Sequence, residues 1–455
     1  MDMKQKKRVS LSTTHIILLS FLLAIALGSL LLWLPISAAD GQSVSYVDAL
    51  FTATTATCVT GLVTLPTVTT WSVFGQIVLL LLIQIGGLGI ITVMTGFMLA
   101  LRREMGLGNR LLIQDAFNLN TLAGLGAFIK RVILGTLFVE LAGALAYMTV
   151  FVPDFGARGI WISVFNSVSA FCNAGIDIFA QDSLCSYATN PVVNLVTSLL
   201  IILGGLGYIV WWDVIRVLGD KEARGRGRLR RLTLHSKIAL TATAAFILGG
   251  AVLIFLFEYD NPLTIGNMSL FDKIQVSLFQ SITTRTAGFA SVPQQNLTSG
   301  ASVVSLLLMF IGGSPVGTAV GVKTVTMVVL IASALSTVKN KNEVTLFHRT
   351  LSAAAIRKAV AVTGMSFAIL LISTLLLSFA TPADTLDVLF ETVSATATVG
   401  LSRDLTSSLN VWGKIIILVT MYLGRVGPIS LAFAFNVKHQ VQNIVKNPVE
   451  EISVG

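Results

Sequence analysis

Four short segments of this 455-residue chain end in a glycine that follows a run of small polar side chains. They read ALFTATTATCVTGL (49–62), SVFNSVSAFCNAGI (163–176), VSLFQSITTRTAGF (276–289) and DVLFETVSATATVGL (387–401). The glycines are Gly61, Gly175, Gly288 and Gly400, separated by 114, 113 and 112 residues. Glycine permits backbone conformations that aim carbonyls inward, and a ring of carbonyl oxygens can replace the hydration shell of a monovalent cation. The regular spacing favours one unit repeated four times over the alternative of four similar polar loops between helices.

A second unusual stretch, GGSPVGTAVGVKT (312–324), interrupts an apolar run. Pro315 removes a backbone donor, and the glycines lower the cost of leaving a helix. Non-helical backbone at membrane depth is tolerated where it is buried in protein or lines an aqueous path. The alternative is a kinked helix packed through small residues, which does not explain Lys323. A nucleotide-binding P-loop is excluded, because Lys323 does not directly follow a glycine and no strand precedes it.

Arg425 is a charged residue inside another apolar segment. A mid-span arginine costs roughly 2.5–3.5 kcal/mol on insertion scales, so a lipid-facing position is unfavourable. Two roles stay open from the residues alone: a position in an aqueous path, or pairing with Glu140, the one acid within a span.

Other chemistry has little support in the sequence. The three cysteines do not form a disulfide framework, and the four histidines are scattered. An intramembrane enzyme would need a Ser/His or paired-Asp constellation at membrane depth, and the apolar segments contain none.

The elements that must position these residues are membrane spans. Mean hydropathy is +0.83 and only 12% of residues are charged, which indicates a polytopic membrane protein. Eight apolar segments have spanning length: about 15–34, 74–100, 128–152, 195–218, 237–257, 303–335, 358–380 and 411–437. The first is too long for a typical signal-peptide core, so we interpret it as a retained span.

The charge distribution predicts the orientation. With a cytoplasmic N-terminus, the inside segments hold 24 of the 31 Lys and Arg residues, and the outside segments hold five. Of the acids, twelve lie outside and nine inside. The net charge of +9 is therefore a positive-inside signature, with no reason to expect nucleic-acid binding. The basic run at 221–231 fits the same signature, with an anionic-lipid or partner site as its alternative.

Each of the four units consists of a span, a polar loop and a second span. Two spans per unit give all four units the same orientation, unlike the inverted repeats of many secondary transporters. The segment YVDALFTATTAT predicts a helix of about three turns that enters from outside, crosses half the membrane and returns as extended chain. The predicted fold is an all-α polytopic membrane protein with eight transmembrane helices and four span–pore-loop–span repeats around a central pore. The repeats are 1–126 (pore loop 46–62), 127–236 (160–176), 237–357 (272–289, broken second span 303–335) and 358–455 (386–401, then a cytoplasmic tail).

These four loops and the broken sixth span resemble the Trk/Ktr/HKT superfamily of potassium transporters over nearly the full chain. Eight spans and a short N-terminus resemble the KtrB-type membrane subunits of bacterial Ktr potassium-uptake systems. The resemblance implies a degenerate potassium filter on four strands: Val59, Thr60 and Gly61; Asn173, Ala174 and Gly175; Thr286, Ala287 and Gly288; Thr398, Val399 and Gly400. Sodium-preferring relatives carry serine at the first filter glycine, so Gly61 favours potassium.

The resemblance also implies that the broken second span of the third repeat is a gate beneath the filter. The implied gate residues are Gly312, Gly313, Ser314, Pro315, Gly317, Thr318, Gly321, Lys323 and Arg425. Arg425 would hold a positive charge in the cation path and could pair with a carbonyl of the gate loop.

Further expectations follow from the resemblance. It implies a homodimer with one pore per subunit in the lipid of the cell inner membrane, with both termini cytoplasmic. It implies a ring of nucleotide-binding regulatory subunits of KtrA type, because this chain has no nucleotide fold of its own. Potassium is the expected transported ion, and sodium stimulation is common among Ktr systems. A sodium-coupled carrier and a poorly selective sodium/potassium conduit are the alternatives.

Overall fold

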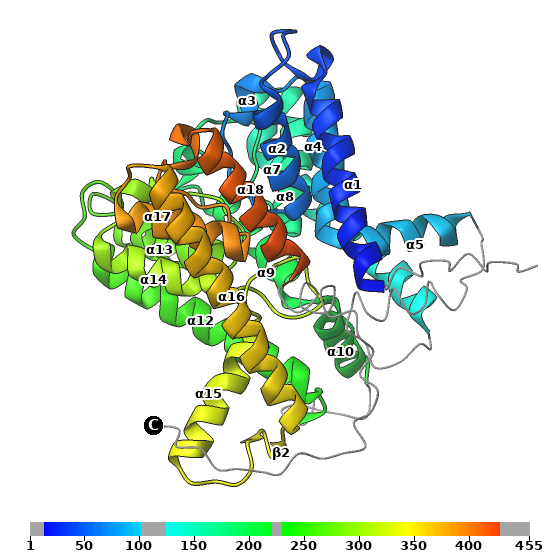
Figure 1. The fold of residues 1–455 in the computed structure, drawn as a ribbon, viewed down its shortest axis with the longest axis vertical. Coiled ribbons are helices and arrows are strands. Elements are labelled where there is room, and N and C mark those ends of the chain that lie inside the picture. The colour runs from blue at the N-terminus through cyan, green and yellow to red at the C-terminus, as the bar shows by residue number, and fades with distance from the viewer. Residues whose placement is uncertain (1–12, 102–123, 221–229, 428–455) are drawn as a thin grey trace, which may run out of the picture.

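The computed structural model describes residues 13–101, 124–220 and 230–427, which form a helical assembly (Figure 1). The principal helices are α1 (Thr13–Trp33), α2 (Tyr46–Cys58), α4 (Val73–Leu88), α5 (Ile90–Ala100), α7 (Leu125–Phe155), α8 (Arg158–Cys172), α9 (Pro191–Leu206), α10 (Tyr208–Gly219), α12 (Leu234–Glu258), α13 (Leu270–Thr283), α14 (Ser299–Phe310), α15 (Thr324–Val338), α16 (Ala353–Ala380), α17 (Thr385–Ala397) and α18 (Val411–Val426). A small antiparallel hairpin of β1 (Thr345–Leu346) and β2 (Arg349–Thr350) joins α15 to α16.

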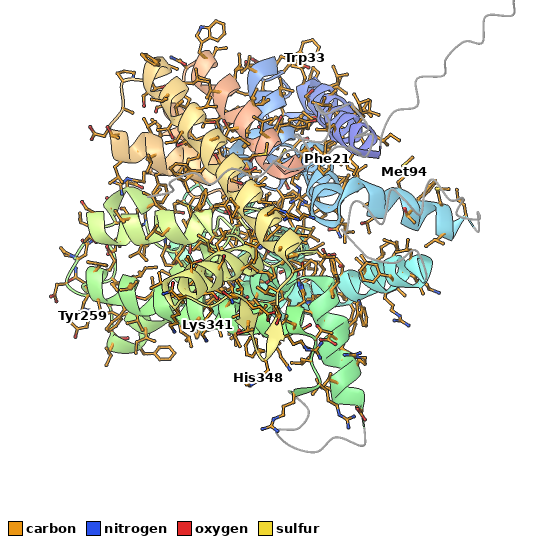
Figure 2. All side chains as sticks on the ribbon, turned by 60° about the horizontal axis from the view of Figure 1, so that its bottom comes forward. Phe21, Trp33, Met94, Tyr259, Lys341 and His348 are labelled. Carbon is orange, nitrogen blue, oxygen red and sulfur yellow. The ribbon has the colours of Figure 1, made fainter. Side chains whose placement is uncertain are left out.

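Within the described part of the chain, four helices are long and apolar enough to cross a membrane alone: α1, α7, α12 and α16. They correspond to the predicted first spans of the four units. Many of their large apolar side chains are exposed, including Leu23, Phe138 and Phe379. Figure 2 shows side chains projecting outward from α1, which carries Trp33, and from α5, which carries Met94. Exposed apolar surface of this extent suits a lipid environment.

The second spans are interrupted more often than the sequence predicts. Only 303–335 is predicted to be broken, but α4/α5 and α9/α10 are each bent by 97°. The bends occur at Gly89 and Gly207, whose φ angles of 83° and 87° favour glycine. Counting each bent pair as one span gives up to six candidate spans among the described residues. In the eighth predicted span, α18 ends at Val426, and the stretch from 428 onward lies outside the described residues.

Four shorter helices, α2, α8, α13 and α17, form the interior. Each carries a fully buried phenylalanine: Phe51, Phe165, Phe279 and Phe390. Longer helices surround them: α2 contacts α1, α4 and α18, and α8 contacts α4, α7 and α9. These Ser/Thr-rich helices are thus short and largely buried, and that they enter the membrane without crossing it stays a prediction.

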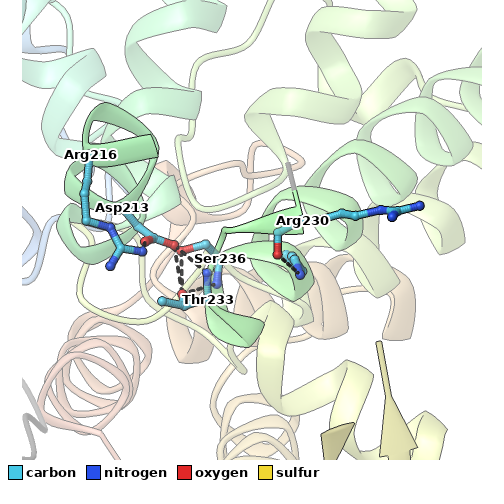
Figure 3. Close-up of polar contacts among 6 residues, drawn as sticks. Asp213, Arg216, Arg230, Thr233 and Ser236 are labelled. Carbon is cyan, nitrogen blue, oxygen red and sulfur yellow. Dashed lines mark hydrogen bonds and ion pairs between the residues drawn. The ribbon is translucent and has the colours of Figure 1, made fainter. Parts of the chain in front are cut away.

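Hydrogen bonds join the middle of α10 to the start of α12 (Figure 3). The backbone N–H and the hydroxyl of Thr233 both donate to Asp213 Oδ2 at 2.9 Å, and Arg216 forms an ion pair with Asp213. Thr233 also caps α12 by accepting from the backbone N–H of Ser236. This cluster holds the two helices together on either side of the residues that are not described.

Candidate functional site

The chain adopts one local geometry four times, beginning within three residues of the end of each interior helix. A non-glycine residue with positive φ is followed by a residue without positive φ and then by a glycine with positive φ. The non-glycine residues are Val59, Asn173, Thr286 and Thr398, with φ between 52° and 66°. Positive φ is uncommon outside glycine, so four occurrences at matched positions mark a backbone constrained by its surroundings.

The four glycines of these turns come together in a closed ring, which we call the glycine ring: Gly61, Gly175, Gly288 and Gly400. We call the short extended segment that carries each glycine a strand. A Cβ added to any ring glycine would lie no more than 2.6 Å from a carbonyl oxygen of the next strand. The oxygens belong to Ala174, Ala287, Val399 and Thr60, in the order of the glycines they face. Gly400 returns to Gly61, so the contacts close on themselves. A side chain is therefore excluded at these four positions by the positive φ angle and by the lack of space for a Cβ.

The glycine ring borders an acidic cavity of about 380 Å³. All four glycines line this cavity, together with Asp177, Asp182 and Asp404. None of the described lining residues is Lys or Arg. Burial raises the pKa of Asp177 from its ordinary range to about 7. Negative charge in a confined cavity raises the local concentration of cations.

Residues 311–323 form the connection between α14 and α15, which we call the intramembrane loop. Ile311 and Val322 form a parallel bridge at its neck, where Gly312 N–H donates to Val322 O at 3.0 Å. Val316 and Gly321 have positive φ, so the chain turns back on itself between them. The predicted break is present, and it is a structured loop rather than a simple kink.

The intramembrane loop lies against the bend between α9 and α10. Ser314 N–H donates to Gly205 O at 2.8 Å, and Tyr208 N–H donates to Val316 O at 2.9 Å. The Thr318 hydroxyl donates to Phe171 O at 3.0 Å, two residues before the strand that leads to Gly175. The loop therefore contacts both a second span and the end of an interior helix.

Arg425 ties the intramembrane loop to a third part of the chain. Its guanidinium donates to Thr318 O at 3.0 Å and also to Gly86 O on α4. The hydrogen bond to a loop carbonyl was expected. The alternative pairing with Glu140 is not formed among the described ion pairs. The described donors to that carboxylate are Gln84 Nε2, at 3.3 Å, and the Cys172 thiol, at 3.9 Å. Lys323 donates to Ala319 O at 2.6 Å within the loop.

The predicted site residues thus fall into two neighbouring groups. The twelve predicted filter residues lie on the four strands of the glycine ring, and the predicted gate residues of the third unit form the intramembrane loop with Arg425 against it. Sequence reasoning missed a buried hydroxyl near the end of each interior helix that bonds to the strand after it: Thr55, Ser169, Thr283 and Ser394. The sequence could have indicated them, because each precedes its ring glycine by five or six residues.

Comparison with known proteins places the whole chain in one group. The sequence model of the TrkH family, described as "Cation transport protein", matches residues 2–447. The Ktr system potassium uptake protein B of Bacillus subtilis (strain 168) is 38% identical, over 99% of this chain and 98% of its own length. The potassium/sodium uptake protein NtpJ of Enterococcus hirae is 36% identical, over 100% of this chain and 99% of its own length.

A solved structure agrees in fold. The crystal structure of the potassium transporter TrkH from Vibrio parahaemolyticus matches with a TM-score of 0.73. The match covers 94% of this chain and 86% of that one, at 17% identity. At that identity the likeness concerns the fold alone.

Proposed function

This chain belongs to the TrkH family of cation transport proteins, a family of transporters rather than enzymes, and on that premise we propose that it carries potassium into the cell through a channel-like pore. The observation that supports the proposal most directly is the closed glycine ring beside an acidic cavity. In this proposal the four carbonyl oxygens of the ring offer a dehydrated monovalent cation the ligands that it loses with its water. The cations for this site are potassium, as in the name of the Bacillus subtilis relative, and sodium, as in the name of NtpJ.

In this proposal the strands around the glycine ring are the selectivity filter, and the intramembrane loop with Arg425 is the gate. Two features support the gate. The loop is held by backbone hydrogen bonds to the bend of α9/α10, and Arg425 places a positive charge against it. A partner that bound the displaced loop more tightly than the present arrangement would open the path.

We further propose the arrangement of the whole chain. Eight spans form four repeats of the same orientation, with boundaries at 126/127, 236/237 and 357/358, around one pore axis. Both termini are on the cytoplasmic side of the cell inner membrane. Two copies form a homodimer, and a cytoplasmic nucleotide-binding subunit of KtrA type controls the gate. The names of two relatives as parts of a Ktr system support a second component.

Ion uptake tests the proposal. Labelled potassium uptake is measured in a strain without its own uptake systems, with and without sodium and a regulatory subunit. We expect saturable potassium uptake that Gly61→Ser and Gly288→Ser weaken in affinity while sodium permeation rises, at unchanged membrane abundance. Unchanged potassium affinity in serine variants of all four ring glycines would remove the filter assignment. Potassium flux in fixed stoichiometry with sodium would instead support the alternative function, a sodium-coupled carrier.

A further inference from the structure

The four buried hydroxyls near the ends of the interior helices stand at matched positions. Thr55, Ser169 and Ser394 lie six residues before their ring glycines, and Thr283 lies five residues before Gly288. All four side chains are fully buried. Each hydroxyl bonds to the backbone of the strand that passes through the glycine ring or leaves it, rather than only to its own helix.

In the first and fourth strands the hydroxyl holds the ring glycine itself. Gly61 N–H donates to Thr55 Oγ1 at 3.0 Å, and Gly400 N–H donates to Ser394 Oγ at 3.0 Å. A trans peptide unit is planar, so its N–H and C=O point in opposite directions. An N–H directed toward the interior helix therefore turns the preceding carbonyl the other way, toward the ring. Those carbonyls belong to Thr60 and Val399, and both are ring oxygens.

The second and third strands are held differently. Ser169 Oγ accepts from Ile176 N–H at 3.1 Å, which fixes the peptide unit after Gly175 and so the carbonyl of Gly175. In the third strand Gly288 N–H donates to the backbone carbonyl of Thr283 at 3.4 Å, and the Thr283 hydroxyl donates to Phe289 O at 2.7 Å. The ring carbonyls of these two strands therefore do not depend on a side-chain hydroxyl in the same way.

We infer that Thr55 and Ser394 are specificity-determining positioning residues, which aim the Thr60 and Val399 carbonyls at the transported cation. The inference rests on the proposed function of the glycine ring as a filter. Selection between potassium and sodium depends on the placement and field strength of the coordinating carbonyls. Loss of either hydroxyl frees its peptide unit to rotate, and a more adaptable ring accommodates the smaller sodium ion at lower cost.

The test compares matched variants of one helix. Thr55→Val removes the hydroxyl and keeps the shape of the side chain, whereas Thr55→Ser keeps the hydroxyl. Thr57→Val is the control, because the Thr57 hydroxyl is equally buried and donates to Ala53 O within the same helix. Ser394→Ala repeats the test in the fourth strand. Potassium and sodium uptake are measured per amount of protein in the membrane.

We expect Thr55→Val and Ser394→Ala each to lower the preference for potassium over sodium by roughly three- to ten-fold, the equivalent of one hydrogen bond. Thr55→Ser should restore the preference, and Thr57→Val should leave it unchanged. An equal loss in Thr57→Val would overturn the inference, because the effect would then belong to the helix. If Gly61→Ser lowers the preference while Thr55→Val and Ser394→Ala do not, the filter stands and the positioning role is wrong. If Gly61→Ser has no effect either, the filter proposal itself is wrong.

Discussion

At the scale of single residues, Lys323 and Arg425 donate to backbone carbonyls, and neither forms an ion pair with a carboxylate among the described residues. The described hydrogen bonds of Arg425 go to Thr318 O and Gly86 O, and that of Lys323 goes to Ala319 O. A guanidinium has several donors in a rigid fork, so Arg425 can hold two carbonyls from different parts of the chain at once. An ammonium group is a single point charge and cannot reproduce that geometry.

We predict that Arg425→Ala raises potassium flux, because the loop loses its tether to α4 and the path loses a charge. Hydrogen bonds to a charged group contribute roughly 1.5–3 kcal/mol, so the increase could reach about ten-fold or more. Arg425→Lys should give an intermediate flux, since the charge stays and the double contact is lost. The measurement is uptake normalised to protein in the membrane. A stable Arg425→Ala variant that conducts less than the parent would contradict the prediction.

A second residue-scale prediction concerns Asp177 in the acidic cavity. Burial raises its pKa to about 7, so the carboxylate is charged above that pH and neutral below it. Uptake at low potassium should therefore fall as the external pH falls through about 7, because the cavity loses a negative charge. In Asp177→Asn, uptake should be lower and lack this step. In Asp182→Asn the step should remain and move to lower pH, since the charge of Asp182 raises the pKa of Asp177. If the fall in uptake with falling pH persists unchanged in Asp177→Asn, a group other than Asp177 causes it.

At the scale of elements, the sequence predicts the interior helices and first spans well because their signals are local. Apolar length predicts α1, α7, α12 and α16, and Arg425 stands out because a charge in an apolar segment is rare. The bends at Gly89 and Gly207 were missed. Each is the last glycine of a Gly-Gly-Leu-Gly sequence, at 86–89 and 204–207, but glycine also serves helix packing, so composition alone does not distinguish a bend from a contact. The Thr55 and Ser394 bonds were missed because Ser and Thr in helices usually bond to their own backbone.

The intramembrane loop can be shortened without opening its neck. A Cβ added to Gly321 would lie 3.0 Å from Gly312 Cα, so these two residues are already neighbours. Deletion of 313–320 should therefore rejoin the chain with little strain and remove the part that contacts Gly205, Phe171 and Arg425. We predict higher maximal potassium flux, reduced dependence on a regulatory subunit and an unchanged preference for potassium over sodium.

The control for the 313–320 deletion keeps the loop length and changes one contact. Thr318→Val removes only the hydroxyl bond to Phe171 O and should raise flux less than the deletion. If the deletion variant inserts stably and conducts less than the parent, the Gly-rich loop is a packing device and the gate proposal is wrong. Flux per membrane protein and protease resistance of the purified variants decide between these outcomes.

At the scale of the whole molecule, polar contacts join segments that are far apart in sequence around the glycine ring. Leu184 N–H donates to Ala290 O at 2.9 Å, and Arg403 contacts both Asp387 and Ser302. Lys414, near the start of α18, donates to Asp48 Oδ1 of α2 at 2.6 Å across 366 residues. The last contact joins the fourth unit to the first. Sequence periodicity predicts four units, but it cannot predict which side chains join them, because such pairs have no fixed spacing.

The ion pair of Lys414 and Asp48 leads to a prediction about the contact between the fourth unit and the first, which we call the closure. Their side chains are only 16% and 13% exposed, so removing one partner leaves a charge with little solvent, at a cost on the order of 1–3 kcal/mol. Lys414→Asp and Asp48→Lys should each lower the thermal stability of the purified protein and weaken ion preference, since α2 leads directly to Gly61. The double exchange should recover part of both losses, because it restores opposite charges at the same two positions. Reversal of Arg216 and Asp213, which both lie on α10, is the control: it should lower stability without changing ion preference. If the double exchange is no better than the worse single variant for either property, the pair does not stabilise the closure, and contacts of α18 with α2 must do so through packing alone.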